Sequence, residues 1–182
     1  DQVLPPIVVV QHIPALYVED LARRLREQTG YTVLPAGDLQ PLRDGTAVLA
    51  PGDHHLRVVE QFGTLRTKFT DEPPVRGHRP AAEILFESCA ALPRPGVACL
   101  MTGMGQDGAA GLLRLRTLGW TTLGQDEASC EIYGMPRAAR ELGAVKHELP
   151  LAAIGPWLVA NCRRSNGQRP GAAAPTETAP RA

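Results

Sequence analysis

The sequence predicts an α/β fold with an open, mainly parallel sheet, helices on both faces and an inserted antiparallel hairpin. Residues 7–10 are a continuous run of β-branched side chains, which is typical of a strand covered on both faces in a parallel sheet. Strand-like and helix-like segments alternate toward both ends of the chain, which indicates helices on both faces of that sheet. In the middle, Leu65, Thr67 and Phe69 alternate with the basic residues at 66 and 68. This alternation indicates a hairpin with one solvent-exposed face.

The first strand is expected to lead into a helix and then a second strand. Pro14 can occupy the first turn of the helix, and Gly30 ends it. A strand is expected at 46–50, before the turn at Pro51-Gly52. The apolar residues of the helix recur at the i, i+3, i+4, i+7 spacing of one face, namely Val18, Leu21, Ala22 and Leu25.

The hairpin comes next, with strands at 56–62 and 64–70 on either side of Gly63. A proline-rich loop at 71–80 then leads to a helix that ends at 93–96. The apolar residues of this helix include Ile84, Leu85 and Cys89.

The remaining chain returns to strand–helix alternation. Strands are expected at 97–102, 120–123 and 145–149, and helices end at Leu118, at about Leu142 and at about Cys162. Ligands of open α/β sheets bind at the carboxyl ends of the strands. His12 and the loop at 103–108 both follow strands, so we expect them at the same edge of the sheet.

Composition excludes several classes of protein. The chain has 182 residues, with 19 basic and 19 acidic side chains, so it has no net field to attract nucleic acid or an anionic membrane. Its apolar runs are far shorter than the roughly 20 residues of a membrane span. Four cysteines without metal-type spacing indicate reduced thiols, and we expect a cytoplasmic protein without a metal.

Domain organisation is expected to be simple, with one folded domain over 1–162. The segment at 163–182 is rich in Ala, Pro and Arg and has few large apolar residues, which predicts disorder. The chain starts at Asp1 without a recognisable leader, so the sequence does not indicate where the protein is targeted. We expect that a natural N-terminus is missing.

The loop at 103–108 supports two interpretations. Gly103, Gly105 and Gly108 match the G-x-G-x-x-G pattern of a dinucleotide site. Asp126 follows 18 residues after Gly108, close to the position of the acidic residue that binds the ribose in such sites. However, Asp107 would place a carboxylate where a pyrophosphate should bind. The other interpretation makes Asp107 functional, because a carboxylate held by loop amides stays ionised and can orient an imidazole.

His12 would supply that imidazole. A single histidine at a strand end is more often structural than catalytic. A second polar group at the same sheet edge makes a catalytic His12–Asp107 pair as reasonable as the structural interpretation.

An ordered set of motifs resembles the catalytic domain of the CheB-type chemotaxis protein-glutamate methylesterases. Across about residues 7–150 the matching stretches are Val-Val-Gln-His-Ile-Pro at 9–14, Ala-Pro-Gly-Asp-His-His at 50–55, Pro-Pro-Val at 73–75, His-Arg-Pro at 78–80, Met-Thr-Gly-Met-Gly-Gln-Asp-Gly-Ala-Ala-Gly at 101–111, Glu-Ala-Ser-Cys at 127–130 and Gly-Met-Pro at 134–136.

The resemblance implies hydrolysis of glutamyl methyl esters on methyl-accepting chemotaxis receptors, with deamidation of some glutamines as a related activity. It places His12 and Asp107 in a Ser/His/Asp triad and gives the backbone N–H of Met104 to the oxyanion site. No cofactor is implied. A receiver domain or chemotaxis kinase is a further implied partner.

One departure from the family is serious. The family's nucleophilic serine lies on a glycine-rich loop before the strand that leads to His12, and this sequence begins too late to contain it. We therefore expect residues 1–182 to be inactive alone, with a receptor-binding relative without catalysis as the alternative. A smaller departure is Ala81, where the family commonly has serine.

Three serines, one cysteine and a histidine pair are further candidates for chemistry. Ser88 falls inside a predicted helix and Ser165 in the tail, whereas Ser129 and Cys130 follow a strand and are possible but weak substitutes for the nucleophile. Asp53, His54 and His55 invite a metal interpretation, but neighbouring strand residues point to opposite faces, so we expect exposed imidazoles at a turn. His78 and Arg79 belong to a loop that is either simply exposed or faces an acidic receptor surface.

Overall fold

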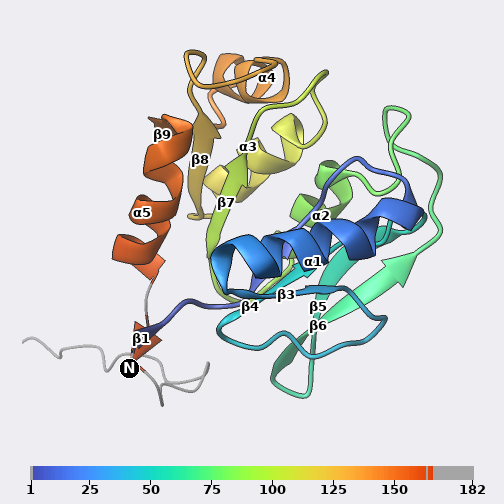
Figure 1. Ribbon diagram of the computed structural model, residues 1–182. Coiled ribbons are helices and arrows are strands. Elements are labelled where there is room, and N and C mark those ends of the chain that lie inside the picture. The colour runs from blue at the N-terminus through green and yellow to red at the C-terminus, as the bar shows by residue number, and fades with distance from the viewer. Residues whose placement is uncertain (1, 163, 166–182) are drawn as a thin grey trace, which may run out of the picture.

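Two parallel sheets, one hairpin and a short antiparallel pair of strands make up the β-structure of this computed structural model, which describes residues 2–162 and 164–165 (Figure 1). The first sheet has the order β2-β4-β3, formed by Ile7–Val9, Thr46–Leu49 and Thr32–Pro35. The second has the order β7-β8-β9, formed by Val97–Leu100, Thr121–Gln125 and His147–Leu149. The predicted α/β class, mainly parallel, is confirmed.

The antiparallel hairpin is also confirmed. Strands β5 (His55–Gln61) and β6 (Thr64–Thr70) pair from His55 opposite Thr70 to Gln61 opposite Thr64. Gly63 lies in the connecting turn with a φ of 72°, a conformation that glycine adopts at little cost.

Helices cover these strands. A 3-10 turn at Ala15–Tyr17 precedes α1 (Val18–Thr29), which ends at Gly30 in a left-handed conformation. The other helices are α2 (Ala82–Cys89), α3 (Ala109–Thr117), α4 (Met135–Glu141) and α5 (Leu151–Cys162). None of the helices in the described residues combines the length and apolar content that a membrane span needs.

Strand β2 is covered on both faces, as its β-branched run predicts. Ile7 and Val9 pack in one apolar cluster with Ala22 of α1, while Val8 packs in a second cluster with Phe86 of α2. Figure 1 shows α1 lying across the near side of β3 and β4. Alternate side chains of one strand therefore join two cores on opposite faces.

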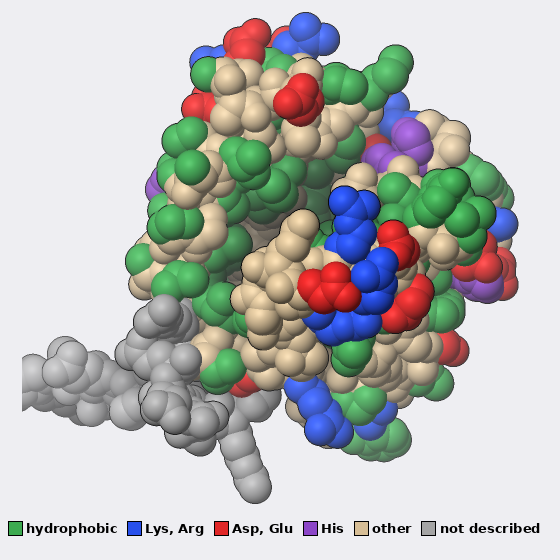
Figure 2. All heavy atoms as spheres, in the orientation of Figure 1, with side chains coloured by type: hydrophobic (Ala, Val, Ile, Leu, Met, Phe, Trp, Pro, Cys, Tyr) green, Lys and Arg blue, Asp and Glu red, His purple; other side chains and the backbone are tan. Residues whose placement is uncertain are grey.

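The parallel strands differ from the expected single sheet in one respect. In the part of the chain that the structure describes, β2 and β7 are outer strands of separate sheets and share no backbone pairing. Figure 2 shows the surface hollowed between α1 and the side of the molecule that carries α5, with hydrophobic side chains at the margin. Each sheet thus presents an unpaired edge toward the middle of the molecule.

Three short strands were not expected. No element was predicted at 32–35, where β3 forms the outer strand of the first sheet with only Val33 buried, so the hydrophobic pattern is weak. Gln2–Val3 (β1) pairs with Arg164–Ser165 (β10), so regular structure reaches Ser165, three positions past the predicted boundary at 162. The rest of the tail for which disorder was predicted, 163 and 166–182, lies outside the described residues.

Candidate active site

His12 and Asp107 meet at the carboxyl ends of β2 and β7. Nε2 of His12 lies 2.8 Å from Oδ2 of Asp107, although the residues are 95 positions apart in the chain. His12 lies three residues after the end of β2, and Asp107 lies just before α3. The proximity predicted for these two residues and their hydrogen bond are confirmed, although β2 and β7 belong to two separate sheets and not to one.

Asp107 also closes the N-terminus of α2. The amide of Ala82 donates to Oδ2 over 2.6 Å, and the amide of Glu83 donates to Oδ1 over 3.1 Å. The N-cap residue of α2 is Ala81, whose side chain cannot accept a hydrogen bond. A carboxylate from a distant loop therefore satisfies amides that a local cap would otherwise bind.

These contacts set the ionisation of the pair. Burial of Asp107, which is 1% exposed, raises the pKa of its carboxyl, but hydrogen bonds from His12 and from the two amides outweigh burial and leave the pKa below its ordinary value. An ionised carboxylate only accepts hydrogen bonds, so Nε2 of His12 must carry the proton. In the neutral ring the lone pair is then on Nδ1, the nitrogen turned away from Asp107.

His78 completes the surroundings of His12. Its ring stacks on that of His12 with 4.0 Å between the centroids and 12° between the planes. Both histidines line a hollow of about 280 Å³ with residues from the turn at Gly52 and the loop at 77–80. The sequence predicts a loop at His78 but no contact with His12, because hydrophobic periodicity carries no information about loop-to-loop contacts.

Gly52 matters to this hollow because the chain approaches it closely. A Cβ at Gly52 would lie 2.2 Å from the backbone nitrogen of Ala15 and 2.6 Å from the carbonyl carbon of Pro14. Only a residue without a side chain lets the turn after β4 pack against the segment that follows His12. The sequence showed a turn here, not the close approach.

The loop that carries Met104 is held by its neighbour at 132–135. The amide of Gly103 donates to the carbonyl of Ile132 over 3.0 Å, and the amide of Met135 donates to the carbonyl of Gly103 over 2.8 Å. Met104 itself is 79% exposed. The loop is therefore anchored at Gly103 while the next residue faces outward.

Comparison with known proteins agrees with this geometry. The family model described as CheB methylesterase matches residues 1–158. The chain belongs to the CheB methylesterase family. The crystal structure of the Thermotoga maritima CheB methylesterase catalytic domain superposes with a TM-score of 0.83 at 32% identity, covering 86% of this chain and 84% of that one.

Two curated relatives carry the name protein-glutamate methylesterase/protein-glutamine glutaminase. The Agrobacterium fabrum protein is 45% identical over 153 residues, which are 83% of this chain and 43% of the relative. The second Pseudomonas aeruginosa protein of this name is 43% identical over 167 residues, which are 91% of this chain and 48% of the relative. The chain therefore spans less than half the length of these relatives.

Membership of the CheB methylesterase family argues against the dinucleotide interpretation of Gly103, Gly105 and Gly108. The carboxylate of Asp107 faces His12 and the first amides of α2. Asp126, the expected ribose partner, instead accepts hydrogen bonds from the amide and the hydroxyl of Ser129.

Ser88 and Ser129 have structural partners. Buried Ser88 accepts a hydrogen bond from the amide of Val58 and donates to the carbonyl of Leu85. Ser129 donates to Asp126 and accepts from the amide of Leu151. Burial raises the pKa of the Cys130 thiol, which opposes its use as a thiolate. Of Ser165, only the backbone lies within the described residues.

The expectation of two exposed imidazoles at His54 and His55 is wrong for His55. His55 is fully buried, accepts a hydrogen bond from the amide of Ala81 and lies within hydrogen-bond distance of the carbonyl of Pro73. His54 is half-exposed and pairs with Asp53 and Asp71. The two rings point to opposite sides, as expected for neighbours at the start of a strand. Among the described residues, no cluster suited to a metal ion forms.

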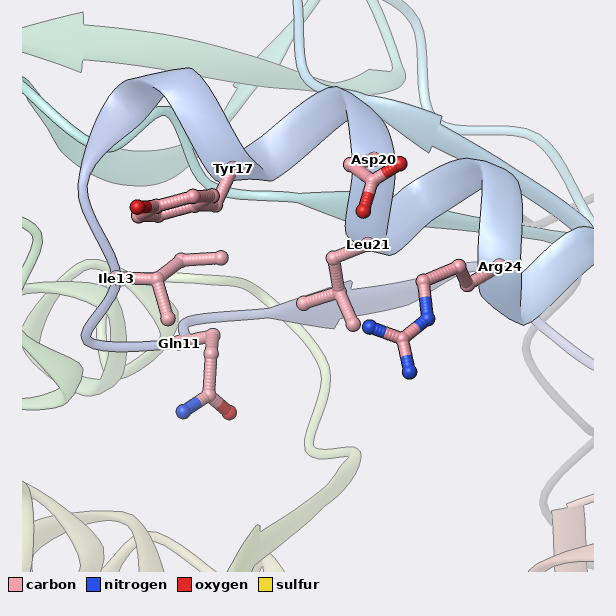
Figure 3. A pocket seen from close by; sticks show the side chains of 6 residues that line it. All are labelled: Gln11, Ile13, Tyr17, Asp20, Leu21 and Arg24. Carbon is pink, nitrogen blue, oxygen red and sulfur yellow. The ribbon is translucent and has the colours of Figure 1, made fainter.

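A second hollow, of about 330 Å³, lies beside α1 (Figure 3). Figure 3 shows Leu21 and Arg24 of α1 pointing toward Gln11, and Tyr17 beside Ile13. Neither His12 nor Asp107 lines this hollow. His12 lines the other, smaller hollow.

Proposed function

We propose that this chain forms most of the catalytic unit of a protein-glutamate methylesterase that acts on chemotaxis receptors in the cytoplasm. The observation that carries the proposal is the His12–Asp107 pair, which is preorganised by the first amides of α2 in a chain of the CheB methylesterase family. Deamidation of receptor glutamines is the related activity, in keeping with the names of the curated relatives. A receiver domain or chemotaxis kinase is a proposed regulatory partner.

His12 is proposed as general base and acid, and Asp107 as the group that orients it. A serine Oγ attacks the side-chain carbonyl carbon of the glutamyl ester while Nδ1 of His12 takes its proton. The N–H of Met104 stabilises the resulting oxyanion. His12 returns the proton to the methoxy oxygen, the C–O bond breaks and methanol leaves.

The second half of the reaction reverses these roles. A water molecule gives its proton to His12 and attacks the acyl-serine ester. The serine oxygen then leaves with that proton, and glutamate is released. Asp107 stays ionised throughout and stabilises the imidazolium form of His12.

The nucleophilic serine is proposed to come from a segment that is not among residues 1–182. Ser88 and Ser129 are engaged in structural hydrogen bonds. A strand inserted between β2 and β7 would pair with both unpaired edges and would end beside His12, because parallel strands share their carboxyl edge. On this proposal residues 1–182 are inactive alone.

Methanol release from a methylated receptor fragment tests the proposal. One sample is the chain of residues 1–182, and the other is the same chain extended by the strand and serine loop that the family resemblance places before residue 7. We expect release only from the extended chain, and a loss of about 10⁶ in turnover when its serine is replaced by Ala.

Two results would contradict this view. Equal rates for the two chains would mean that the nucleophile is already present, and Ser129→Ala and Cys130→Ala would identify it. An extended chain that binds the receptor fragment but releases no methanol would favour the alternative of a receptor-binding relative without catalysis.

A further inference from the structure

We propose that His78 is a positioning residue that fixes the plane of the His12 ring, an inference that rests on the proposed role of His12 as the base. A hydrogen bond at Nε2 restricts rotation about the Cβ–Cγ bond only loosely, because Nε2 lies close to the axis of that bond. The broad preference of this torsion in histidine makes such rotation inexpensive. Something else must determine where Nδ1 points.

The His78 ring is placed to do this. With 4.0 Å between centroids and 12° between planes, the two rings are in direct face-to-face contact. Rotation of His12 about its Cβ–Cγ bond would drive its edge into the face of His78. The stack therefore restricts the ring plane, whereas Asp107 restricts the position of Nε2.

The backbone of His78 is itself held firmly. The amides and carbonyls of Val75 and His78 exchange two hydrogen bonds, of 2.9 and 3.0 Å. Between them, Arg76 and Gly77 have φ values of 50° and 83°, as in the tight hairpin turn that requires positive φ at both central residues. His78 is thus fixed at the end of a two-residue turn.

The chain on the other side of His78 is also anchored. Pro80 is buried, and the amide of Ala81 donates to Nδ1 of buried His55 over 3.2 Å. The next amide, that of Ala82, already binds Asp107. One short segment therefore carries both the ring that stacks on His12 and the amides that hold its carboxylate partner.

The stack also has an electrostatic consequence. During the proposed reaction His12 becomes a cation, and an aromatic face such as phenylalanine would present at position 78 attracts a cation. A flat ring at position 78 is therefore expected to serve both geometry and charge, whereas an aliphatic side chain of similar size serves neither.

The test compares His78→Phe, which keeps a flat ring, with His78→Leu, which does not. In residues 1–182 labelled with ¹⁵N-histidine, NMR measures exchange of the His12 Nε2 proton with water, assigned by its loss in His12→Gln. We expect exchange near that of the unsubstituted chain in H78F and about two- to tenfold faster in H78L, the range expected for loss of an aromatic stack. His147→Leu, which removes an imidazole that contacts Trp157 and not His12, is the matched control.

Kinetics of the extended chain give a second readout. H78L should lower kcat with little change in KM, and H78F should restore most of kcat, because the ring orients the base and does not bind substrate. Unfolding midpoints of the variants are measured in parallel, since a purely structural role would lower the midpoint without separating H78F from H78L. If H78L does not fold, His78→Ala takes its place in both readouts.

The outcomes separate this inference from the proposed function. Equal Nε2 exchange in H78L and the unsubstituted chain overturns the role of His78 and leaves the His12–Asp107 pair standing. Equal acceleration in H78F and H78L also overturns it, because a flat ring would then have no special effect. Absence of a protected Nε2 proton in the unsubstituted chain contradicts the pair itself, and both proposals fall.

Discussion

Replacing Asp107 by Asn keeps the size of the side chain but removes its negative charge. The carboxylate oxygens of Asp107 accept hydrogen bonds from His12, Ala82 and Glu83. The pKa of Asp107 is lowered in the folded protein, so its contribution to stability is present above the unfolded-state pKa and is lost as pH falls through the folded-state pKa. We expect D107N to lower the free energy of unfolding by about 1–3 kcal/mol at pH 7. The difference should shrink below about pH 4.

Urea unfolding at several pH values measures this difference. Asp53→Asn is the matched control, because the pKa of Asp53 is also lowered, by its contact with His54, but the side chain is well exposed and should contribute little. A pH-independent deficit in D107N would show that charge is not the cause. In the extended chain, D107N should also slow turnover by about 10⁴, because Asn favours the wrong tautomer of His12.

Gly52 tests whether the close approach of two loops sets the geometry of the site. Gly52→Ala would put a methyl group against the backbone of Pro14 and Ala15, so we expect a loss of about 1–3 kcal/mol in the free energy of unfolding. The ¹⁵N resonances of His12 should shift as well. The control is Gly37→Ala, where an added Cβ would only touch the Gln40 side chain at 3.4 Å. Equal effects of the two substitutions would rule out a special role for Gly52.

At the scale of elements, Ser88 joins α2 to β5. Ser88→Ala would leave the amide of Val58 without its partner in the core, which costs about 1–3 kcal/mol. Chemical denaturation should show this loss, while methanol release by the folded extended chain should be unchanged at saturating substrate. A large loss of kcat with little change in stability would instead point to a chemical role for Ser88.

The sequence predicted elements well where hydrophobic pattern decides and poorly where long-range contact decides. The β-branched run of β2 and the alternation of β6 carry their own periodicity, and both strands form close to the expected bounds. Strand β3 was missed because burial of Val33 alone leaves little pattern to read. The hydrogen bonds that Ala82 and Glu83 donate to Asp107 come from backbone amides, so residue type gives no way to predict them.

The site was predictable to a similar extent. His12 and Asp107 could be paired because each follows a parallel strand, and such strands end at one edge of a sheet. His78 was not linked to His12, and His55 was wrongly expected to be exposed, because the turn at 76–77 and the packing of the hairpin base set their positions. Tertiary packing, with no signal in local spacing, stacked His78 on His12 and buried His55 against the amide of Ala81.

For the whole molecule, the unpaired edges of β2 and β7 predict unequal protection of backbone amides. Hydrogen exchange measured by mass spectrometry on residues 1–182 should be faster in these strands than in β4 and β8, which have neighbours on both sides. In the extended chain, exchange in β2 and β7 should slow toward that of the inner strands. Equal protection of β2 and β4 in residues 1–182, unchanged by the extension, would argue against an inserted strand.

Asp107 binds the first amides of α2 as well as His12, and this double role affects how natural selection would act on variants of the protein. Because Ala81 offers α2 no cap of its own, losing Asp107 weakens the fold as well as the proposed chemistry. A population selected only for abundance would thus retain Asp107 even if catalysis brought no advantage. Persistence of this aspartate is therefore not by itself a record of selection for activity. Ala81→Ser, which supplies a local cap, would separate the two pressures.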